Sequence, residues 1–376
     1  MSKEYRICTK CIMDTSDPKI TFDEKGVCNH CREYDERVKR DLHCDEAGKI
    51  RFAKVVAEIK ESGRNKKYDC VLGVSGGTDS TFLLYLLKKM GIRPLAVHLD
   101  NGWDSELSVK NIEQVLKKLN IDLYTHVLDW EEFKSLQKSF LNASIANAEI
   151  PTDHAIVAIL YKMAMENGIK YIISGGNITT EAIMPTSWMY DPKDWKIIKY
   201  INEKFGKSEL KSFPHLSIFD WANCTFIKKI KYIPVLNYIP YVKKDAMEIL
   251  QREFGWRSYG AKHYESIYTR FFQGYILPQK FNIDKRRAHL STLICSKQIT
   301  REEALKEMHN SPYITESLMR EDKEYVTKKL GFSELEFEAI MNQPVKTYKD
   351  YPNNSWFFDK NNFFVRLVRK IITRNY

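Results

Sequence analysis

A run of small and hydroxyl-bearing residues separates an apolar segment from an amphipathic one early in the chain. Residues 75–81 read SGGTDST and follow the apolar run 70–74. A Gly-rich loop that leads from a strand into a helix offers backbone N–H groups to an anion, and phosphate is a common ligand of such loops. The spacing is not that of a Walker A loop, because no lysine precedes the hydroxyl residue. The run therefore predicts a phosphate site of another kind; the alternative is a tight strand–helix turn that merely favours Ser and Gly.

Two CxxC pairs near the start of the chain have the spacing of a metal site. They comprise Cys8, Cys11, Cys28 and Cys31. Four thiolates on two tight turns complete a tetrahedral zinc site with no open position, so we expect a structural Zn²⁺. A redox pair is the alternative, but neither CxxC is expected at the start of a helix that follows a strand. His30 lies beside Cys31 and could compete as a ligand, although four sulfurs are expected.

The elements that must position the phosphate loop form a regular pattern between residues 68 and 176. Strand-like and helix-like segments alternate there, which predicts a parallel sheet covered by helices. Ligands of such sheets bind at the carboxyl ends of the strands. We expect strands at 69–74, 94–100, 121–128 and 170–175, and helices near 79–90, 105–119, 130–142 and 153–167. Three polar strings fall at predicted strand ends, namely 75–81, 98–102 and 174–181.

The sequence divides into three expected regions, and its composition limits the class of protein. We expect a zinc module over 1–45, a nucleotide-binding domain over 46–215 and a mainly helical region for substrate or a partner over 216–376. The net charge of +10 in 376 residues suits nucleic acid, an anionic membrane surface or acidic small substrates. The sequence contains no run of 18 apolar residues and no signal peptide at its start, so we expect a cytoplasmic protein with no transmembrane segment.

The loop string resembles the SGGxDS PP-loop of the ATP pyrophosphatase superfamily. This resemblance implies an α/β fold with a parallel sheet, of the HUP (adenine nucleotide alpha hydrolase-like) class. It also implies that ATP is cleaved between its α and β phosphates, which adenylates a carbonyl-type oxygen that a nucleophile then displaces. The loop residues that the resemblance assigns to ATP are Ser75, Gly76, Gly77, Thr78, Asp79, Ser80 and Thr81.

The string LDNGW at 99–103 resembles the strand-end motif that follows the PP-loop in GMP synthetases. The resemblance implies that the backbone near His98 reads the adenine edge and that Asp100 faces the ribose or a metal. The alternative for Asp100 is an Asx turn that closes a strand.

The string at 174–181 resembles the strand-end motif of ammonia-dependent NAD synthetases. The resemblance implies that Gly175 and Asn177 lie at the nucleotide and that Glu181 joins Asp79 in holding Mg²⁺ on the triphosphate. Mg²⁺ prefers one or two carboxylates together with phosphate oxygens and water, which agrees with this assignment. The alternative is a helix-capping Asn177 followed by a solvated Glu181.

Two later strings, residues 254–266 and 280–291, narrow the resemblance from the superfamily to one family. With the CxxC pairs they resemble the N-acetyl sugar amidotransferase family, whose WbpG- and PseA-like members act in O-antigen lipopolysaccharide and flagellin-glycan pathways. The implied reaction converts a sugar acetamido group into an acetamidino group through an adenylylated imidate and ammonia. A basic residue of the C-terminal region is implied at the leaving pyrophosphate, and Lys262 is the candidate. The residues expected to bind acidic groups of a nucleotide-linked sugar are Arg270, Lys285, Arg286, Arg287 and His289; the alternative is a solvated helix face.

The source of ammonia is expected to lie outside the chain. A glutaminase needs an activated cysteine nucleophile, and no cysteine here follows Met1 or sits in a Gly-x-Cys-x-Gly turn. The family resemblance implies a separate HisH-like glutaminase, with delivery through a HisF-like barrel as one route.

Two other classes of function compete with this interpretation. A tRNA-modifying PP-loop enzyme, a thiolase or lysidine-type ligase, would suit the zinc module, the basic charge and the aromatic residues. Sulfur-transfer members usually carry catalytic cysteines in the nucleotide domain, however, and Cys70 lies inside a predicted strand, so no nucleic acid is expected. A non-enzymatic zinc protein on an inactive nucleotide fold is the second rival, and the complete loop motif argues against it.

Overall fold

A parallel β-sheet stands at the centre of the computed structural model, which describes residues 4–260 and 264–358. In this described part the sheet has five strands in the order β3-β2-β1-β4-β5, and every neighbouring pair is parallel. The strands are β1 (Cys70–Gly73), β2 (Pro94–Asp100), β3 (Leu123–Val127), β4 (Tyr171–Ile173) and β5 (Lys231–Ile233). The predicted parallel-sheet α/β class is therefore confirmed.

The order of the strands creates one natural place for a ligand. The chain adds β2 and then β3 on one side of β1, and it returns to place β4 on the other side. The strand order thus reverses between β1 and β4, and ligands of open α/β sheets bind in the crevice at the carboxyl ends of such a pair. Two of the polar strings, 75–81 and 174–181, directly follow these two strands.

The two faces of the sheet are covered by different helices. Leu72 of β1 packs on one face among residues of α2 (Glu46–Ser62), α3 (Thr78–Lys89), α4 (Glu106–Leu119) and α10 (Lys243–Phe254). Val71, the adjacent residue, packs on the other face against α6 (Ile150–Glu166). Alternation follows from the two-residue period of a strand, and both side chains are buried, as expected for a parallel sheet covered on both faces.

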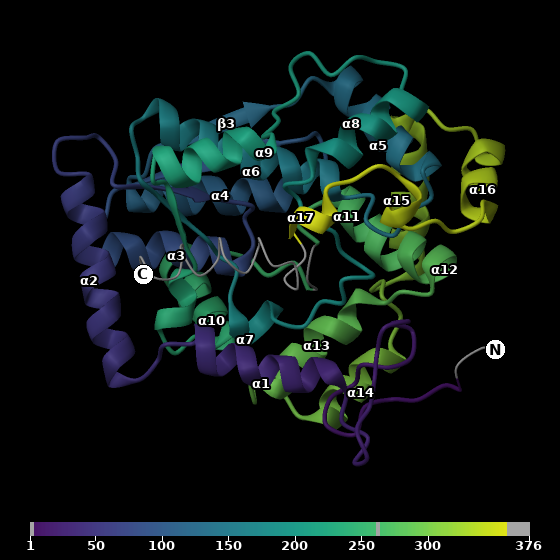
Figure 1. The fold of residues 1–376 in the computed structure, drawn as a ribbon, viewed down its shortest axis with the longest axis horizontal. Coiled ribbons are helices and arrows are strands. Elements are labelled where there is room, and N and C mark those ends of the chain that lie inside the picture. Colours follow the sequence, from purple (N-terminus) through teal and green to yellow (C-terminus); the bar gives the residue numbers. More distant parts are fainter. Residues whose placement is uncertain (1–3, 261–263, 359–376) are drawn as a thin grey trace.

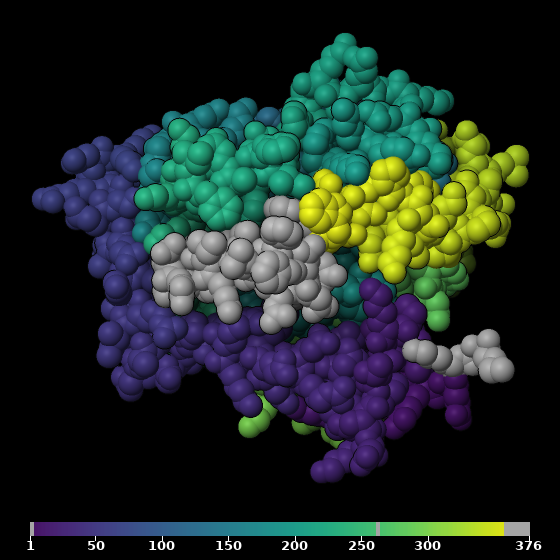
Figure 2. Space-filling model, viewed as in Figure 1, coloured from purple at the N-terminus to yellow at the C-terminus, as the bar shows by residue number. Residues whose placement is uncertain are grey.

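A third apolar cluster joins the two ends of the chain. It brings the cysteine-rich N-terminal segment and α1 (Asn29–Asp41) together with helices from the C-terminal half. In Figure 1, α1 runs beside α13 and α14 at the lower edge of the molecule, and Figure 2 shows the N-terminal segment along this same edge. The remaining helices are α5 (Trp130–Asn142), α7 (Ile178–Glu181), α8 (Trp195–Phe205), α9 (Ile218–Ala222), α11 (Ile267–Phe271), α12 (Leu277–Phe281), α13 (Lys285–Cys295), α14 (Arg301–His309), α15 (Glu316–Leu330), α16 (Glu334–Asn342) and α17 (Ser355–Phe358). Short π-helical and 3₁₀ turns are η1 (Asn223–Ile227), η2 (Val235–Tyr238), η3 (Phe272–Ile276) and η4 (Tyr348–Asp350).

The predicted division at residue 215 cuts through the sheet. Four strands form where apolar runs predicted them, but β5 lies in the region that was expected to be mainly helical. Because β5 pairs with β4, residues beyond 215 complete the sheet that leads into the Gly-rich loop. None of the described helices is both long enough and apolar enough to cross a membrane.

Candidate active site and cysteine cluster

The PP-loop turns sharply between β1 and α3. Gly76 has a positive φ of +78°, a conformation that favours glycine, and Gly77 is the N-cap residue of α3. The hydroxyls of Ser75 and Ser80 lie 3.5 Å apart, and the Gly77 N–H donates to Ser75 Oγ at 3.4 Å. No side chain caps the start of α3, and the residues of its first turn line the cavity in front of the loop, as an anion site requires.

Two aromatic side chains hold the loop from the C-terminal half of the chain. Trp256 Nε1 and the Tyr259 hydroxyl both donate to the Gly76 carbonyl oxygen at 2.9 Å. A Cβ atom at position 76 would lie 2.8 Å from the Tyr259 hydroxyl and 3.0 Å from the Ser108 carbonyl oxygen. The close approach of these groups and the positive φ together explain why glycine stands at position 76.

Asp79 and Glu181 face the same cavity from two strand ends. Asp79 lies in the first turn of α3 and Glu181 at the end of α7, and both line the space in front of the PP-loop. Asp79 accepts a hydrogen bond from the Tyr241 hydroxyl. Burial raises the pKa of Tyr241, and the charges of Asp79 and Glu181 raise it further, so this hydroxyl remains a donor at neutral pH. Two carboxylates beside a phosphate loop are a donor set that suits Mg²⁺.

Two neighbouring cavities open over the carboxyl ends of the strands. The first, of about 380 Å³, lies in front of the PP-loop, and the second, of about 550 Å³, extends from β1, β2 and β4 to the start of α6 and to α13. Both are lined by Ser75, Gly175, Glu181 and Glu265. The predicted nucleotide residues that line the first cavity are Ser75, Gly77, Thr78, Asp79, Ser80, Gly175 and Glu181.

His98, Lys285 and His289 line the second cavity. His98 is buried; its Nδ1 lies 2.9 Å from the Val74 carbonyl oxygen and its Nε2 lies 3.0 Å from Asp104 Oδ2. Burial alone would lower the pKa of His98, but the hydrogen bond and charge of Asp104 outweigh it, and the pKa is raised. The ring can donate to both acceptors only as the imidazolium, so the two contacts favour the charged form.

The three arginines predicted to bind substrate line neither of the two cavities. Arg270 forms a bidentate ion pair with Asp322 at 2.6 and 2.7 Å, and Arg287 pairs with Asp14 at 3.1 Å. Arg286 pairs with Asp284 at 2.7 Å at the start of its own helix. Their guanidinium groups join elements of the fold, and the predicted substrate residues that do line the second cavity are Lys285 and His289.

Three predicted nucleotide residues have structural roles in this arrangement. The Asn177 side chain caps α7 by accepting from Thr180 N, and Thr81 is buried beneath the loop. Asp100 Oδ1 accepts from Gly102 N at 2.8 Å, and this contact forms the Asx turn that was the alternative to nucleotide binding. Asp100 also lines a separate surface hollow between α4 and β3. The predicted pyrophosphate cation, Lys262, lies outside the described residues.

Further residues line the first cavity and were not predicted from the sequence, among them Lys243, Trp256, Tyr259 and Glu265. Trp256, Tyr259 and Glu265 belong to the string that carried the family resemblance, so their region was marked although their contacts were not. Lys243 and Tyr241 stand in no motif. Their position follows from the packing of α10 against α3, which no local pattern predicts.

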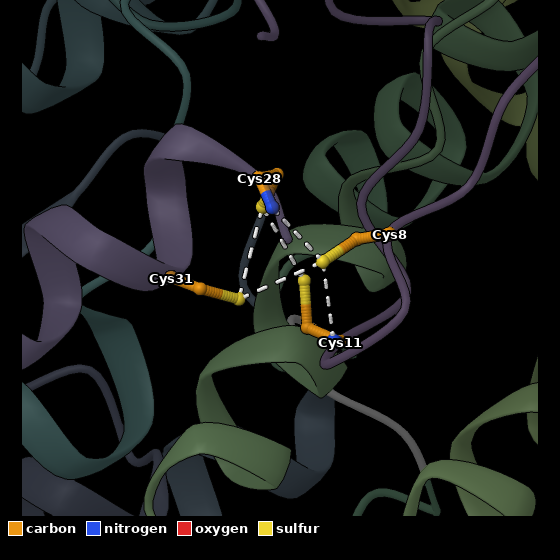
Figure 3. A group of neighbouring side chains, drawn as sticks. All are labelled: Cys8, Cys11, Cys28 and Cys31. Atoms are coloured by element: carbon orange, nitrogen blue, oxygen red, sulfur yellow. Dashed lines mark hydrogen bonds between the residues drawn. The ribbon is translucent and has the colours of Figure 1, made fainter. Parts of the chain in front are cut away.

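The four cysteines of the CxxC pairs converge on one point (Figure 3). Sulfur–sulfur distances are 3.8 Å for Cys8–Cys31, 3.7 Å for Cys11–Cys28 and 3.7 Å for Cys28–Cys31. A tetrahedral zinc with Zn–S bonds of about 2.3 Å holds its sulfurs about 3.8 Å apart, so the cluster fits Zn²⁺. His30 is engaged elsewhere, 2.7 Å from Asp17, which leaves four sulfurs as expected.

The surroundings of the cysteine cluster support a structural role. Backbone N–H groups of Cys11 and Cys28 point at Cys8 Sγ at 3.4 and 3.2 Å, and such donors stabilise thiolates. Arg301 of α14 donates to the carbonyl oxygens of Cys8 and Cys11 at 3.0 Å. Cys28 caps the start of α1, but no strand precedes this helix among the described residues, and the second CxxC pair beside it makes a four-cysteine cluster.

Two family models match separate parts of the chain. The model described as queuosine biosynthesis protein QueC matches residues 69–175, which contain β1 to β4 and the PP-loop. The model described as LPS biosynthesis protein WbpG-like, C-terminal domain, matches residues 265–364, which contain Lys285 and His289. The chain is therefore similar to QueC over its PP-loop region and to WbpG-like proteins over its C-terminal region. It thus combines an ATP pyrophosphatase-type nucleotide domain with a WbpG-like C-terminal domain.

Known proteins resemble parts of the chain at low identity. An uncharacterized protein of Methanocaldococcus jannaschii is 26% identical over 179 residues, which are 45% of this chain and 58% of that protein. A tRNA(Ile)-lysidine synthase of Chlamydia pneumoniae is 39% identical over 69 residues, 18% of this chain and 21% of that protein. The chain therefore spans less than two thirds of either relative. A tRNA-5-methyluridine(54) 2-sulfurtransferase of Thermotoga maritima is 25% identical over 254 residues, 63% of this chain and 72% of that protein.

Solved structures show weak likeness. An NH3-dependent NAD synthetase from Campylobacter jejuni is 15% identical with a TM-score of 0.32 and covers 78% of this chain and 96% of that one. An NMN synthetase from Francisella tularensis is 16% identical with a TM-score of 0.28 and covers 61% of this chain and 93% of that one.

Proposed function

We propose that this chain uses ATP to convert the N-acetyl group of a sugar into an acetamidino group, in the biosynthesis of a bacterial surface polysaccharide or flagellin glycan. The amide oxygen attacks the α-phosphorus of ATP, the bond to the bridging oxygen breaks, and pyrophosphate leaves. Ammonia then attacks the carbon of the O-adenylyl imidate, the carbon–oxygen bond breaks, and AMP leaves. An amide is a poor electrophile, and adenylation makes its oxygen a good leaving group.

One observation carries the proposal: the two matched regions line two neighbouring cavities that share part of their wall. The PP-loop residue Ser75 lines both cavities, and Lys285 and His289 of the WbpG-like region line the second. A nucleotide whose phosphates lie at the loop would therefore face a substrate held by the WbpG-like helices. Positioning of the two reactants is the main rate advantage that such a site supplies.

The charged residues of the first cavity suit the departure of pyrophosphate. The N–H groups at the start of α3 and the half-buried Lys243 face the phosphate region. Asp79 and Glu181 would hold a magnesium ion, which supplies charge neutralisation on the phosphates when bound. We further propose that ammonia comes from a separate HisH-like glutaminase, with a HisF-like protein as its conduit.

The test combines ATP, Mg²⁺ and ammonium chloride with UDP- and CMP-linked diacetamido uronic or nonulosonic acids. We expect pyrophosphate release together with a sugar product in which one oxygen is replaced by NH, read by mass spectrometry. Pyrophosphate release with bulk tRNA, and with none of the sugars, would overturn the proposal.

The similarity to tRNA-modifying relatives makes RNA modification the second candidate. The structure argues against RNA thiolation, because all eight cysteines lie in the described residues and none of them lines either cavity. Cys70 of β1, the cysteine nearest in sequence to the PP-loop, is fully buried in the sheet. A sulfur-transfer cysteine must reach the adenylated base, and no thiol stands in that position.

A further inference from the structure

A cluster of mixed charge lies in the second cavity, at the start of α6. Lys285 Nζ lies 3.2 Å from Glu149 Oε2, and Gln273 Nε2 donates to the same oxygen at 2.8 Å. Asp153, one turn along from Glu149, lines the same cavity. The side chains of Glu149 and Lys285 are almost fully enclosed, so their ion pair is a buried one.

The charges of this cluster do not balance. Two carboxylates face one ammonium group, and the ammonium of Lys285 is directed to Glu149. Among the described residues, no hydrogen bond or ion pair engages the Asp153 carboxylate. Burial raises the pKa of Asp153 to about 7, the charge of Glu149 adds to the rise, and Lys285 opposes it. At neutral pH this group therefore gains and loses a proton readily.

The cluster is fixed relative to the reaction centre. Asn101, just beyond β2, donates from its side-chain amide to Thr152 Oγ1 at 3.3 Å, which joins the start of α6 to a strand end. The helix also packs on β1 and β2. Asp153 therefore lies in a rigid wall of the space that the PP-loop also lines, within reach of a small diffusing nucleophile.

We propose that Asp153 is the proton acceptor that converts ammonium into the ammonia nucleophile. The excess negative charge of the cluster attracts NH₄⁺, which has no lone pair and cannot attack carbon. Asp153 takes one proton, the lone pair of NH₃ forms the new carbon–nitrogen bond, and the carbon–oxygen bond breaks so that AMP leaves with its electron pair. The product is the amidinium, and Asp153 returns its proton to water. This inference rests on the proposed function and names the ammonia subsite within it.

Other titratable groups share the cavity and set the background of any pH profile. Lys285 and His289 face it from α13, and Glu149 precedes α6. Across the space lie His98, Asp104, Glu181, Tyr232 and Glu265. Only the ammonia-dependent half of the reaction depends on Asp153, so the two halves must be measured separately.

The test compares wild type with Asp153→Asn, using Glu166→Gln at the exposed end of the same helix as the matched control. ATP–pyrophosphate exchange with an acetamido sugar reports adenylation, and amidine formation with ammonium chloride reports the second half. We expect Asp153→Asn to keep the exchange and to lose about 10²-fold or more of amidine formation at neutral pH, the usual contribution of general base catalysis. Hydroxylamine, which is already an uncharged nucleophile at neutral pH, should restore turnover in the variant.

The outcomes separate this inference from the proposed function. Equal amidine formation by the variant and wild type, or a variant that hydroxylamine does not restore, would overturn the role of Asp153. No exchange by wild type with any acetamido sugar would overturn the proposed function instead. Where Asp153→Asn fails to fold, the wild-type profile decides: the rate on total ammonium should level off above about pH 7, the pKa of Asp153. A rate that continues to follow free ammonia at higher pH would contradict the inference.

Discussion

The Asp79 carboxylate shows how one side chain can serve both the fold and the proposed chemistry. It accepts a hydrogen bond from the Tyr241 hydroxyl, and Tyr241 packs beside Phe82 of α3 with ring centroids 5.7 Å apart. The contact therefore fixes the first turn of α3 against the segment that precedes α10. The same carboxylate faces the phosphate cavity with Glu181, which makes it the first residue to change.

Replacing Asp79 by Asn should abolish turnover while the fold remains intact. The amide oxygen of Asn can still accept from Tyr241, whereas the charge that would hold magnesium is lost. We would measure pyrophosphate release and the melting temperature together. Tyr241→Phe is the matched control, since it removes the contact and keeps the carboxylate. Near-normal turnover by Asp79→Asn would refute the role in metal binding.

His98 should make stability depend on pH in a defined direction. Its pKa is raised in the folded state by Asp104, so the folded protein binds the proton more tightly than the unfolded chain does. The resulting stabilisation is complete below about pH 6.5, the unfolded value, and is lost as pH rises through the higher folded value. The melting temperature of His98→Gln should thus fall below wild type by more at acid pH than at alkaline pH. A gap that widens with increasing pH would contradict this assignment.

Elements differ in how far the sequence determines them. The strands β1, β2, β3 and β4 could be predicted because each is a continuous apolar or alternating run flanked by helical periods. The three residues of β5 could not, because they stand among lysines and gain their strand geometry only by pairing with β4. Chain segments such as this one depend on a tertiary partner, which local patterns do not contain.

The N-terminal cysteine loops are short, and the cluster of four cysteines is suited to hold them together through a zinc ion. Cys28→Ser should lower stability or solubility, because a structural zinc contributes folding free energy directly. Metal content by mass spectrometry and the melting temperature are the readouts. Cys44→Ser, at a half-buried thiol outside the cluster, should change neither. A soluble, active and zinc-free Cys28→Ser protein would exclude the structural zinc.

Over the whole molecule, basic residues that were predicted to bind substrate instead form ion pairs and hydrogen bonds between segments that lie far apart in the sequence. Arg287 of α13 donates to the Ile12 carbonyl oxygen at 2.7 Å and pairs with Asp14, which binds the cysteine loops to the C-terminal helices. The sequence could predict a cluster of cations near 285–289 but not which of them face a cavity. That choice depends on acidic partners far along the chain, whose positions follow only from the packed fold.

Arg270 best tests whether these basic residues bind substrate or hold the fold together, because the two roles predict different results. Its ion pair with Asp322 joins α11 to α15, both side chains are largely buried, and Tyr313 donates to the same carboxylate at 2.9 Å. Arg270→Met leaves a buried carboxylate without its cation and should cost about 3–5 kcal/mol of unfolding free energy. The KM for the sugar should stay near that of wild type in the folded fraction. The double variant Arg270→Met/Asp322→Leu should recover much of the stability, since no charge is then left unpaired. A raised KM without loss of stability would return Arg270 to the substrate site.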